Sequence, residues 1–236
     1  MGQASEIAVT EPAVTPVPEY LHQTYWWAYV HPNAVRFFER QWLVNAILWG
    51  NFRKLRDAAL DELGASLPGR TLQVACVYGD FTPNLVRRIA PGGCLDVVDV
   101  LPIQLSNLGN KLDANAPVNL LHRNAADLGF VAEGYERAIL FFLLHEVPLD
   151  VRRRVLSEAM RVVKPGGQVV IVDYHKPSAW HPLRSVMKLV LRTLEPFALD
   201  LWAHEVSEWF PAGIDKSALR KETYCGGLYQ KLSITV

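Results

Sequence analysis

The sequence has few cysteines, no excess charge of either sign and no long apolar run. Its 236 residues include three cysteines, Cys76, Cys94 and Cys225, with no CxxC spacing. A disulfide framework and a structural zinc site are therefore not expected, and a reducing compartment is the simpler setting. The 24 Lys and Arg residues balance the 24 Asp and Glu residues, which argues against nucleic acid as a partner. The longest apolar run, Ala138 to Leu144, has seven residues, whereas a membrane-spanning helix needs about 20.

The N-terminal segment also lacks the features of a targeting sequence. Residues 1–18 contain three prolines, no Lys or Arg and no apolar core. A signal peptide begins with basic residues and continues into an apolar core. We therefore expect residues 1–18 to form a flexible arm.

Residues 19–64 are unusually aromatic and are predicted to be helical. The segment from Tyr20 to Phe52 holds ten of the chain's 24 aromatic residues (seven Trp, eight Tyr and nine Phe in all). Pro32 suits the first turn of a helix, and Gly64 suits a C-terminal cap. One interpretation is a pair of core-packing helices. The other is a lid over a large apolar ligand, because so many aromatics exceed what a single helical stripe can bury.

Beyond residue 64, apolar segments that favour strands alternate with helical ones. Strands are predicted over 71–77, 95–100, 118–122, 137–144 and 168–173, and helices over 82–90, 103–112 and 149–163. A strand, a Gly-Gly turn and a strand follow over 219–225, 226–227 and 228–236. Alternation with fully apolar strands predicts an α/β domain over 65–236, built on a doubly wound, mostly parallel, seven-stranded sheet. Residues 164–167 are expected to end the last helix in a sharp turn.

A basic amphipathic helix is predicted within an insertion over 180–200. Apolar residues from Leu183 to Leu194 follow a helical period, and Arg184, Lys188 and Arg192 recur every four residues on another face. No acidic residue occurs over 176–193. An ordinary surface helix and a helix that lies on an anionic membrane surface both fit this pattern.

Acidic residues stand at or after the ends of the first three predicted strands of the domain. In a doubly wound sheet, ligands bind beyond the carboxyl ends of the strands. Asp99 is placed to accept hydrogen bonds from ribose hydroxyls, and Asp127 is placed to read an adenine amino group. Asp80 follows the first strand and is either a ligand contact or a helix N-terminal cap. The spacing predicts a nucleotide-type site.

These segments resemble the class I S-adenosylmethionine methyltransferases, which have a Rossmann-like fold. They are most similar to the ubiquinone and menaquinone C-methyltransferases. The resemblance covers roughly residues 65–178 and rests on 71–82, Asp99, Asp127 and 161–167. It implies S-adenosylmethionine as cofactor, bound by Val77, Tyr78, Gly79, Asp80, Asp99, Val100, Asn124, Ala125, Asp127 and Phe142. The chain departs from that family at three positions. Gln73 replaces an acidic residue, Val77 replaces a glycine, and Tyr78 replaces a small residue.

Three segments resemble a divergent relative, the rhodoquinone biosynthesis family (RquA). They are 25–33, 77–82 and 141–146. The resemblance implies that ubiquinone is converted to rhodoquinone, with a ring methoxy group replaced by an amino group from S-adenosylmethionine. It also implies a manganese or iron ion. Because the isoprenoid tail of ubiquinone lies in lipid, we expect a cytoplasmic enzyme peripherally associated with the inner membrane. A conventional quinone methyltransferase and a non-catalytic S-adenosylmethionine- or quinone-binding accessory protein remain alternatives. The oligomeric state stays open.

The residues that we expect to carry this chemistry lie at the strand ends and in the aromatic segment. His145 and Glu146 follow the fourth strand, where an imidazole beside a carboxylate can bind a metal ion or relay a proton, or can serve only as a cap. Tyr78 and His175 complete the expected catalytic set. The quinone is expected to contact Trp26, Trp27, Tyr29 and His31.

Overall fold

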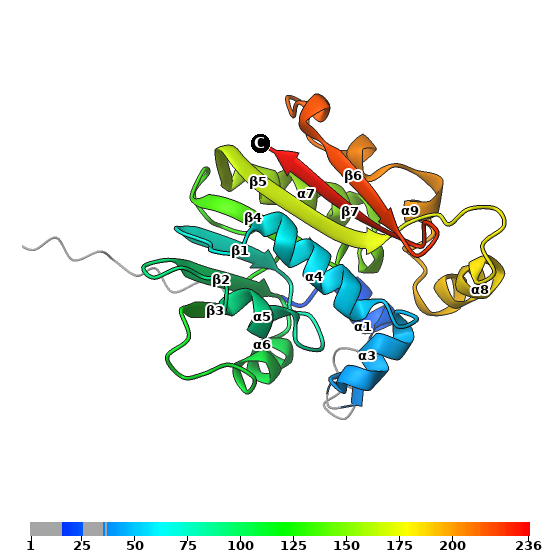
Figure 1. Cartoon of the computed structure of the whole chain (residues 1–236), viewed down its shortest axis with the longest axis horizontal. Helices are drawn as coiled ribbons and strands as arrows, with labels where there is room; N and C mark the ends of the chain where they lie inside the picture. The colour runs from blue at the N-terminus through cyan, green and yellow to red at the C-terminus, as the bar shows by residue number, and fades with distance from the viewer. Residues whose placement is uncertain (1–15, 26–34, 36) are drawn as a thin grey trace, which may run out of the picture.

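The computed structural model describes residues 16–25, 35 and 37–236, and a seven-stranded sheet forms its centre (Figure 1). The strands are β1 (Arg70–Val74), β2 (Cys94–Asp99), β3 (Val118–His122), β4 (Tyr135–Phe141), β5 (Val163–Tyr174), β6 (Arg220–Tyr224) and β7 (Tyr229–Thr235). They lie in the order β3-β2-β1-β4-β5-β7-β6. Strands β1 to β5 pair in parallel, and β7 pairs antiparallel with both β5 and β6. The predicted α/β class and the doubly wound, mostly parallel sheet are confirmed.

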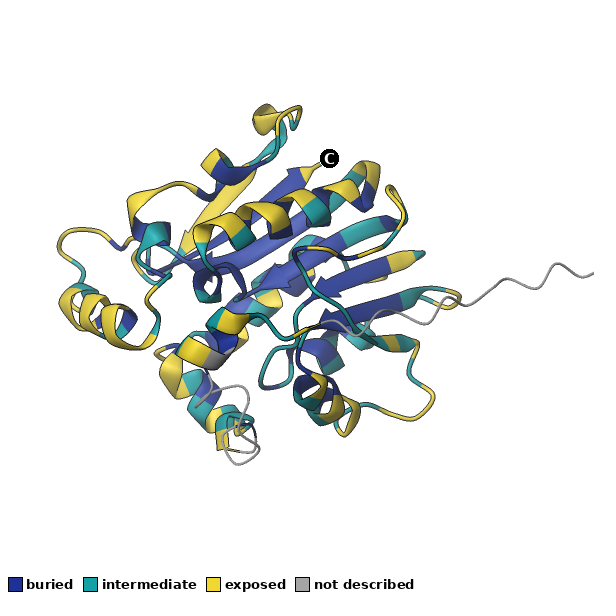
Figure 2. Cartoon of the chain, turned by 180° about the vertical axis from the view of Figure 1, so that it is seen from behind, coloured by how far each residue is buried: buried dark blue, intermediate teal, exposed yellow. Residues whose placement is uncertain are grey.

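Helices cover both faces of this sheet, which is why its inner strands are apolar on both sides. Helix α4 (Phe52–Leu63) crosses the face turned to the viewer in Figure 1, and α7 (Leu149–Arg161) crosses the opposite face, in front in Figure 2. Ala138, Ile139 and Leu140 of β4 are completely buried between these layers. The remaining helical elements are α5 (Phe81–Val86), α6 (Pro102–Gly109), α9 (Asp200–Ala203), η2 (Leu144–Glu146), η3 (Val206–Trp209) and η4 (Lys216–Ala218).

The sharp turn expected over residues 164–167 is part of strand β5. Tyr135 pairs with Val163 and Arg137 pairs with Gln168, so the intervening residues bulge out of the β4–β5 ladder. A Cβ on Gly167 would lie 2.6 Å from a methyl of Val163, so the bulge needs a glycine there. The strand begins earlier than predicted because a bulge interrupts pairing without ending it.

The aromatic segment divides between the core and an outer layer. Helices α1 (Glu19–Thr24) and α3 (Gln41–Ile47) lie beyond the carboxyl end of the sheet (Figure 1). Helix α4 instead belongs to the core, because Phe52, Leu55 and Leu60 are buried against the strands. Of the two interpretations of residues 19–64, a pair of core-packing helices and a lid, α4 fits the first. Gly64 ends α4 at φ +117°, as its predicted capping role requires.

The predicted amphipathic helix is present as α8 (Arg184–Leu194). It is anchored by the buried side chains of Met187 and Leu191, while most of its other residues are exposed. The indole Nε1 of Trp49, just after α3, donates to the sulfur of Met187 at 2.9 Å. This contact joins α8 to α3 at the carboxyl end of the sheet. Across the described residues, no helix is both long and apolar enough to cross a membrane.

Candidate active site

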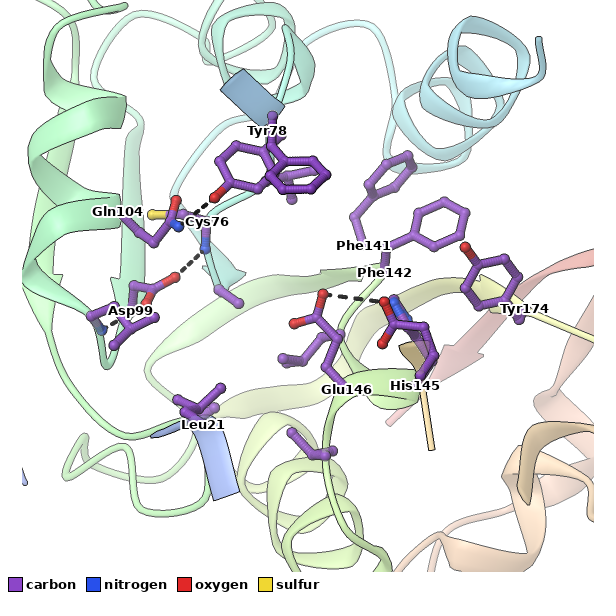
Figure 3. Close-up of a pocket in the computed structure, with 18 of the residues that line it drawn as sticks. Leu21, Cys76, Tyr78, Asp99, Gln104, Phe141, Phe142, His145, Glu146 and Tyr174 are labelled. Atoms are coloured by element: carbon purple, nitrogen blue, oxygen red, sulfur yellow. Dashed lines mark hydrogen bonds and ion pairs between the residues drawn. The ribbon is translucent and has the colours of Figure 1, made fainter. Parts of the chain in front are cut away.

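A cavity of about 460 Å³ lies beyond the carboxyl ends of β1, β2 and β4, the edge at which doubly wound sheets bind ligands. Figure 3 shows polar side chains on two sides of it. Tyr78, Asp99 and Gln104 lie on one side, and His145 and Glu146 lie on the other. Apolar and aromatic residues form most of the remaining wall. The cavity therefore suits a ligand that is apolar in the middle and polar at both ends.

The loop after β1 is crowded by two large side chains. Val77 and Tyr78 both line the cavity. The ring of Tyr78 stacks on Phe38 with centroids 6.1 Å apart, and its hydroxyl accepts a hydrogen bond from Gln104 Nε2 at 2.9 Å. Burial raises the pKa of Tyr78, so the phenol keeps its proton at neutral pH. The side chain that replaces a small residue is thus fixed in place.

The outer side of this loop is held by a charged cluster. Gly79 adopts φ +82°, and a Cβ there would approach Gln41 and Phe52 to 3.0 and 3.1 Å. Its N–H donates to Glu39 at 3.1 Å, and Lys111 Nζ donates to the same carboxylate at 2.8 Å and to the Gly79 carbonyl at 2.9 Å. Gly79 does not itself line the cavity. It holds the backbone that presents residues 77 and 78.

Gln73, in β1, holds the beginning of the same loop through hydrogen bonds of its side chain. The side chain is completely buried. Its oxygen accepts a hydrogen bond from the Thr82 hydroxyl at 2.9 Å, and its nitrogen donates to the Ala75 carbonyl at 3.0 Å. Ala75 has the left-handed φ of +72°, which few non-glycine residues adopt. A carboxylate at position 73 would turn an oxygen toward that carbonyl, so the amide is matched to this loop.

Asp99 ends β2 with an almost completely buried carboxylate. One oxygen accepts from the N–H of Cys76 and the other from the N–H of Leu101, both at 2.8 Å. Burial raises the pKa of Asp99 to about 6, although these two N–H groups favour the charged form. Each oxygen retains a second lone pair that can accept a ligand hydroxyl.

The loops after β2 and β3 contribute a further part of the wall. Val100, Asn124 and Ala125 line the cavity, as predicted. Asp127 is exposed and does not line it; its N–H donates to the Asn124 carbonyl at 3.0 Å in a short backbone bridge. The expected contact between Asp127 and an adenine amino group is therefore not supported, because the bridge turns back toward the surface.

His145 lies in the 3-10 turn η2, directly after β4, and is positioned by Asp173 at the end of β5. Its Nδ1 lies 2.9 Å from Asp173 Oδ1, and its Nε2 lies 3.6 Å from Glu146 Oε1 (Figure 3). Burial alone would lower the pKa of His145, but Asp173, Glu146 and Glu195 outweigh it and raise the pKa to about 9. His145 is therefore a cation at neutral pH. Phe142, predicted to contact the cofactor, lines the cavity beside it.

Glu195 is a cavity residue that the sequence analysis did not identify. It caps the C-terminus of α8 and lines the cavity on the side of His145. Burial raises its pKa, although the His145 charge and a hydrogen bond with Tyr25 lower it. Glu195 is the first acidic residue after the stretch 176–193. That position is the one feature of the sequence that could have marked it as a site residue. Helix α8 thus delivers a carboxylate to the site as well as a basic face to the surface.

Arg152 of α7 locks the turn that carries His145 and Glu146. Its completely buried guanidinium donates to the carbonyls on either side of these two residues, Leu144 at 2.8 Å and Val147 at 3.1 Å. It also donates to the carbonyl of Phe197, in the segment after Glu195, at 2.8 Å. One cation therefore ties η2 to the chain that follows α8.

Replacing Arg152 with Met is expected to lower the free energy of unfolding by about 3 kcal/mol, since several buried carbonyls lose their donor. Thermal or urea unfolding measures this change. Arg153→Met is the matched control, because Arg153 is exposed on the same helix, and its effect should stay within about 0.5 kcal/mol. Equal stability of the two variants would contradict the role given to Arg152.

Besides Gly79 and Asp127, two more predicted site residues lie outside the cavity wall, and four others lie outside the described residues. Asp80 pairs with Arg56 at 2.6 Å, and its side chain makes no capping hydrogen bond at α5. His175 lies against the β6–β7 hairpin, with Nδ1 2.8 Å from the Gly227 carbonyl and Nε2 3.1 Å from Lys221 Nζ. This position does not support a catalytic role for His175. The predicted quinone contacts Trp26, Trp27, Tyr29 and His31 are not described.

The geometry does not support the expected manganese or iron site at His145 and Glu146. Within residues 16–25, 35 and 37–236, no group of three or more His, Cys, Asp or Glu side chains is arranged to hold a metal ion. We assign no chemical step to a metal ion.

Residues 39–214 match the model of the ubiE/COQ5 methyltransferase family. The chain belongs to this family. It is 26% identical over 181 residues to the demethylmenaquinone methyltransferase of Bacillus licheniformis, covering 76% of this chain and 77% of that protein. It is also 26% identical over 183 residues to the corresponding Bacillus subtilis enzyme, with the same coverage.

Solved structures share the fold at low sequence identity. The N-methyltransferase NodS of Bradyrhizobium japonicum superposes with a TM-score of 0.55 and 15% identity, covering 77% of this chain and 93% of that chain. A SAM-dependent methyltransferase of Aquifex aeolicus superposes with a TM-score of 0.52 and 17% sequence identity, covering 86% of this chain and 97% of that chain. These structures confirm the class I S-adenosylmethionine methyltransferase fold.

Proposed function

We propose that this ubiE/COQ5 family member converts ubiquinone to rhodoquinone, replacing a ring methoxy group with an amino group whose nitrogen comes from S-adenosylmethionine. On this proposal, the chain is a member of the rhodoquinone biosynthesis family. The observation that carries the proposal is the rigid, crowded loop after β1. Val77 and Tyr78 line the cavity at the two positions where the resemblance to the quinone methyltransferases implies a glycine and a small residue. They leave less room for the usual pose of the aminoacyl group, so its nitrogen is turned toward the acceptor.

The side of the cavity near β2 suits the adenosine part of S-adenosylmethionine. Asp99 can accept hydrogen bonds from the ribose hydroxyls, and Val100, Asn124 and Ala125 flank the space for the base. When bound, S-adenosylmethionine would supply the nitrogen, which would add to the ring carbon that bears the methoxy group, with loss of methanol. The Cα–N bond would then break as the quinone ring takes two electrons from Cα and water hydrolyses the resulting C=N bond, which leaves an amino-hydroquinone and a 2-oxo acid. The Tyr78 ring, held between Phe38 and Gln104, separates this side from the quinone side.

Binding of S-adenosylmethionine is expected to weaken as the pH falls through about 6. The burial of Asp99 raises its pKa to about 6, and only the carboxylate accepts two ribose hydrogen bonds. The affinity should be full above this pH and fall by about tenfold per pH unit below it, since one proton competes with the ligand. Calorimetric titration over pH measures this. Asp99→Asn should bind more weakly and without the pH dependence; an unchanged profile would contradict the assignment.

The opposite side of the cavity suits the quinone ring. Addition of an amine to a quinone builds negative charge on a ring carbonyl oxygen, and a fixed donor near that oxygen lowers the barrier. The protonated His145 lines the cavity and can donate from Nε2, because Asp173 holds Nδ1. A charged imidazolium can supply the stabilisation otherwise expected from a metal ion.

A proton must also leave the attacking amine, which requires a base near the nitrogen. Glu146 and Glu195 line the cavity near His145. Burial raises the pKa of Glu195, which makes its carboxylate a better proton acceptor than an exposed one. We assign the base to this pair, while His145 keeps its own proton.

Methylation of a quinone ring carbon is the second candidate function. It is favoured by the relatives of this chain, which are demethylmenaquinone methyltransferases. This alternative retains Asp99 as the ribose contact but treats Val77 and Tyr78 as tolerated substitutions.

Isotope transfer from S-adenosylmethionine separates these functions. Purified protein is incubated with a short-chain ubiquinone and S-adenosylmethionine that carries heavy nitrogen in its amino group and heavy carbon in its methyl group. We expect heavy nitrogen in the quinone and loss of one methoxy group. Heavy carbon in the quinone would instead identify a methyltransferase. Binding of both ligands without turnover would indicate an accessory protein.

A further inference from the structure

Exposed apolar side chains from two different segments border the mouth of the cavity. Ile47 and Trp49, at the end of α3, and Leu194, at the end of α8, line the cavity and are also 41–46% exposed. A side chain that both lines the cavity and is exposed to solvent lies at the opening of the cavity. The apolar interior of the cavity therefore continues onto the surface between α3 and α8, which lie at the same end of the molecule (Figure 1).

The apolar border extends outward along both helices. Leu189 and Val186 of α8 are 64% and 46% exposed, and Trp42 of α3 is 62% exposed. We call these two side chains of α8, Trp42 and the three mouth residues the apolar rim. Among the described residues, ten large apolar side chains are strongly exposed, and only Phe37, Val131, Leu149 and Trp180 lie outside the rim. Such concentration around one opening is typical of a binding surface rather than of scattered surface residues.

Positive charge lies next to the rim, although the whole chain is neutral. Lys188 and Arg192 are exposed on α8 beside its apolar face, and Arg184 begins the helix. No carboxylate of the described residues pairs with Lys188 or Arg192 within ion-pair distance, and no acidic residue occurs over 176–193. A helix with an exposed apolar face and a row of cations alongside it matches an anionic lipid surface.

We propose that the apolar rim and the basic row of α8 dock the protein on an anionic lipid bilayer, with the mouth of the cavity facing the lipid. The rim side chains insert among the acyl chains, and Lys188 and Arg192 meet lipid phosphates. A lipid-soluble ligand then passes from the bilayer into the cavity without crossing water. The route for a quinone tail rests on the proposed function; the docking surface itself does not.

Co-sedimentation with vesicles that contain no quinone tests the surface. We expect binding to vesicles of phosphatidylcholine and phosphatidylglycerol, and much weaker binding to phosphatidylcholine alone. Leu189→Glu should weaken binding by about tenfold through lost insertion, and Lys188→Glu should weaken it by about tenfold on the anionic vesicles only. Val131→Glu and Arg153→Glu are matched controls, since both residues are exposed and lie away from the rim. Both controls should bind like the parent protein.

The possible results test the docking surface and the proposed function independently. Vesicle binding that is equal in Leu189→Glu, Lys188→Glu and the two controls would overturn the docking surface, whatever the enzyme does. A dimer in solution that Leu189→Glu dissociates would also overturn it, and would assign the rim to a second copy of the chain. Vesicle binding that depends on the rim, together with no amination of a short-chain quinone, would uphold docking and reject the proposed function.

Discussion

Replacing His145 with Gln is expected to lower kcat for quinone amination by about a hundredfold to a thousandfold, the usual loss when a donor to a developing oxyanion is removed. The glutamine amide can still donate to Asp173, which also accepts the N–H groups of Leu144 and Tyr174 at 2.8 and 2.7 Å. The fold of the turn is therefore expected to persist. What the variant loses is the positive charge that His145 presents to the cavity.

Steady-state kinetics and calorimetry with S-adenosylmethionine measure the consequences separately. Since His145 lies on the quinone side, the affinity for S-adenosylmethionine should remain that of the parent protein. His175→Gln is the matched control, because His175 also follows a strand at the carboxyl edge but lies outside the cavity. Its kcat should be unchanged. A His145→Gln variant with parental kcat would remove the imidazolium from the mechanism.

The double variant Val77→Gly/Tyr78→Thr should lower the rate of amination by about a hundredfold. It restores the small residues of the wider family and gives the aminoacyl group space to take another pose. A misplacement of about 1 Å between reacting atoms is enough for such a loss. The rate of nitrogen transfer, measured by mass spectrometry of the quinone, reports the change.

Tyr78→Phe is the control for this pair of substitutions. It keeps the ring stacked on Phe38 and removes only the hydroxyl that accepts from Gln104. If bulk sets the pose, Tyr78→Phe should retain most of the activity. Parental amination in the double variant would show that the crowded loop does not direct the nitrogen, and the principal reason for preferring amination over methylation would be lost.

The sequence predicted the inner strands β1, β2 and β4 well because they are largely buried and leave a strong apolar pattern. The edge strand β3 is only half-buried, yet it was also predicted. The β3 prediction, 118–122, has the bounds of the strand itself. The predicted helix ends were less accurate. Helix α5 ends at Val86, whereas the sequence analysis extended this helix to residue 90. The order of the strands and the antiparallel pairing of β7 depend on tertiary packing, and the sequence analysis did not predict them.

The cavity was predicted in part, for a physical reason. Asp99 ends a strand, and Asn124 and His145 lie within four residues of a strand end. The geometry of a parallel sheet places such residues at its carboxyl edge, and all three line the cavity. Glu195 comes from a distant helix end, and its only signal was that it is the first acidic residue after 176–193. Arg152, which supports the cavity from a helix interior, is marked by no local pattern. The sequence left core packing and a lid open for residues 19–64 because an aromatic helix in the core and one in a lid have the same periodicity.

A crystal structure of the protein with S-adenosylmethionine tests the central claim most directly. The account predicts that the ribose hydroxyls contact Asp99 and that the amino nitrogen, rather than the sulfonium methyl, points across Tyr78 toward His145 and Glu146. A structure in which the methyl group points toward these residues, or in which Val77 and Tyr78 exclude the ligand altogether, would contradict it.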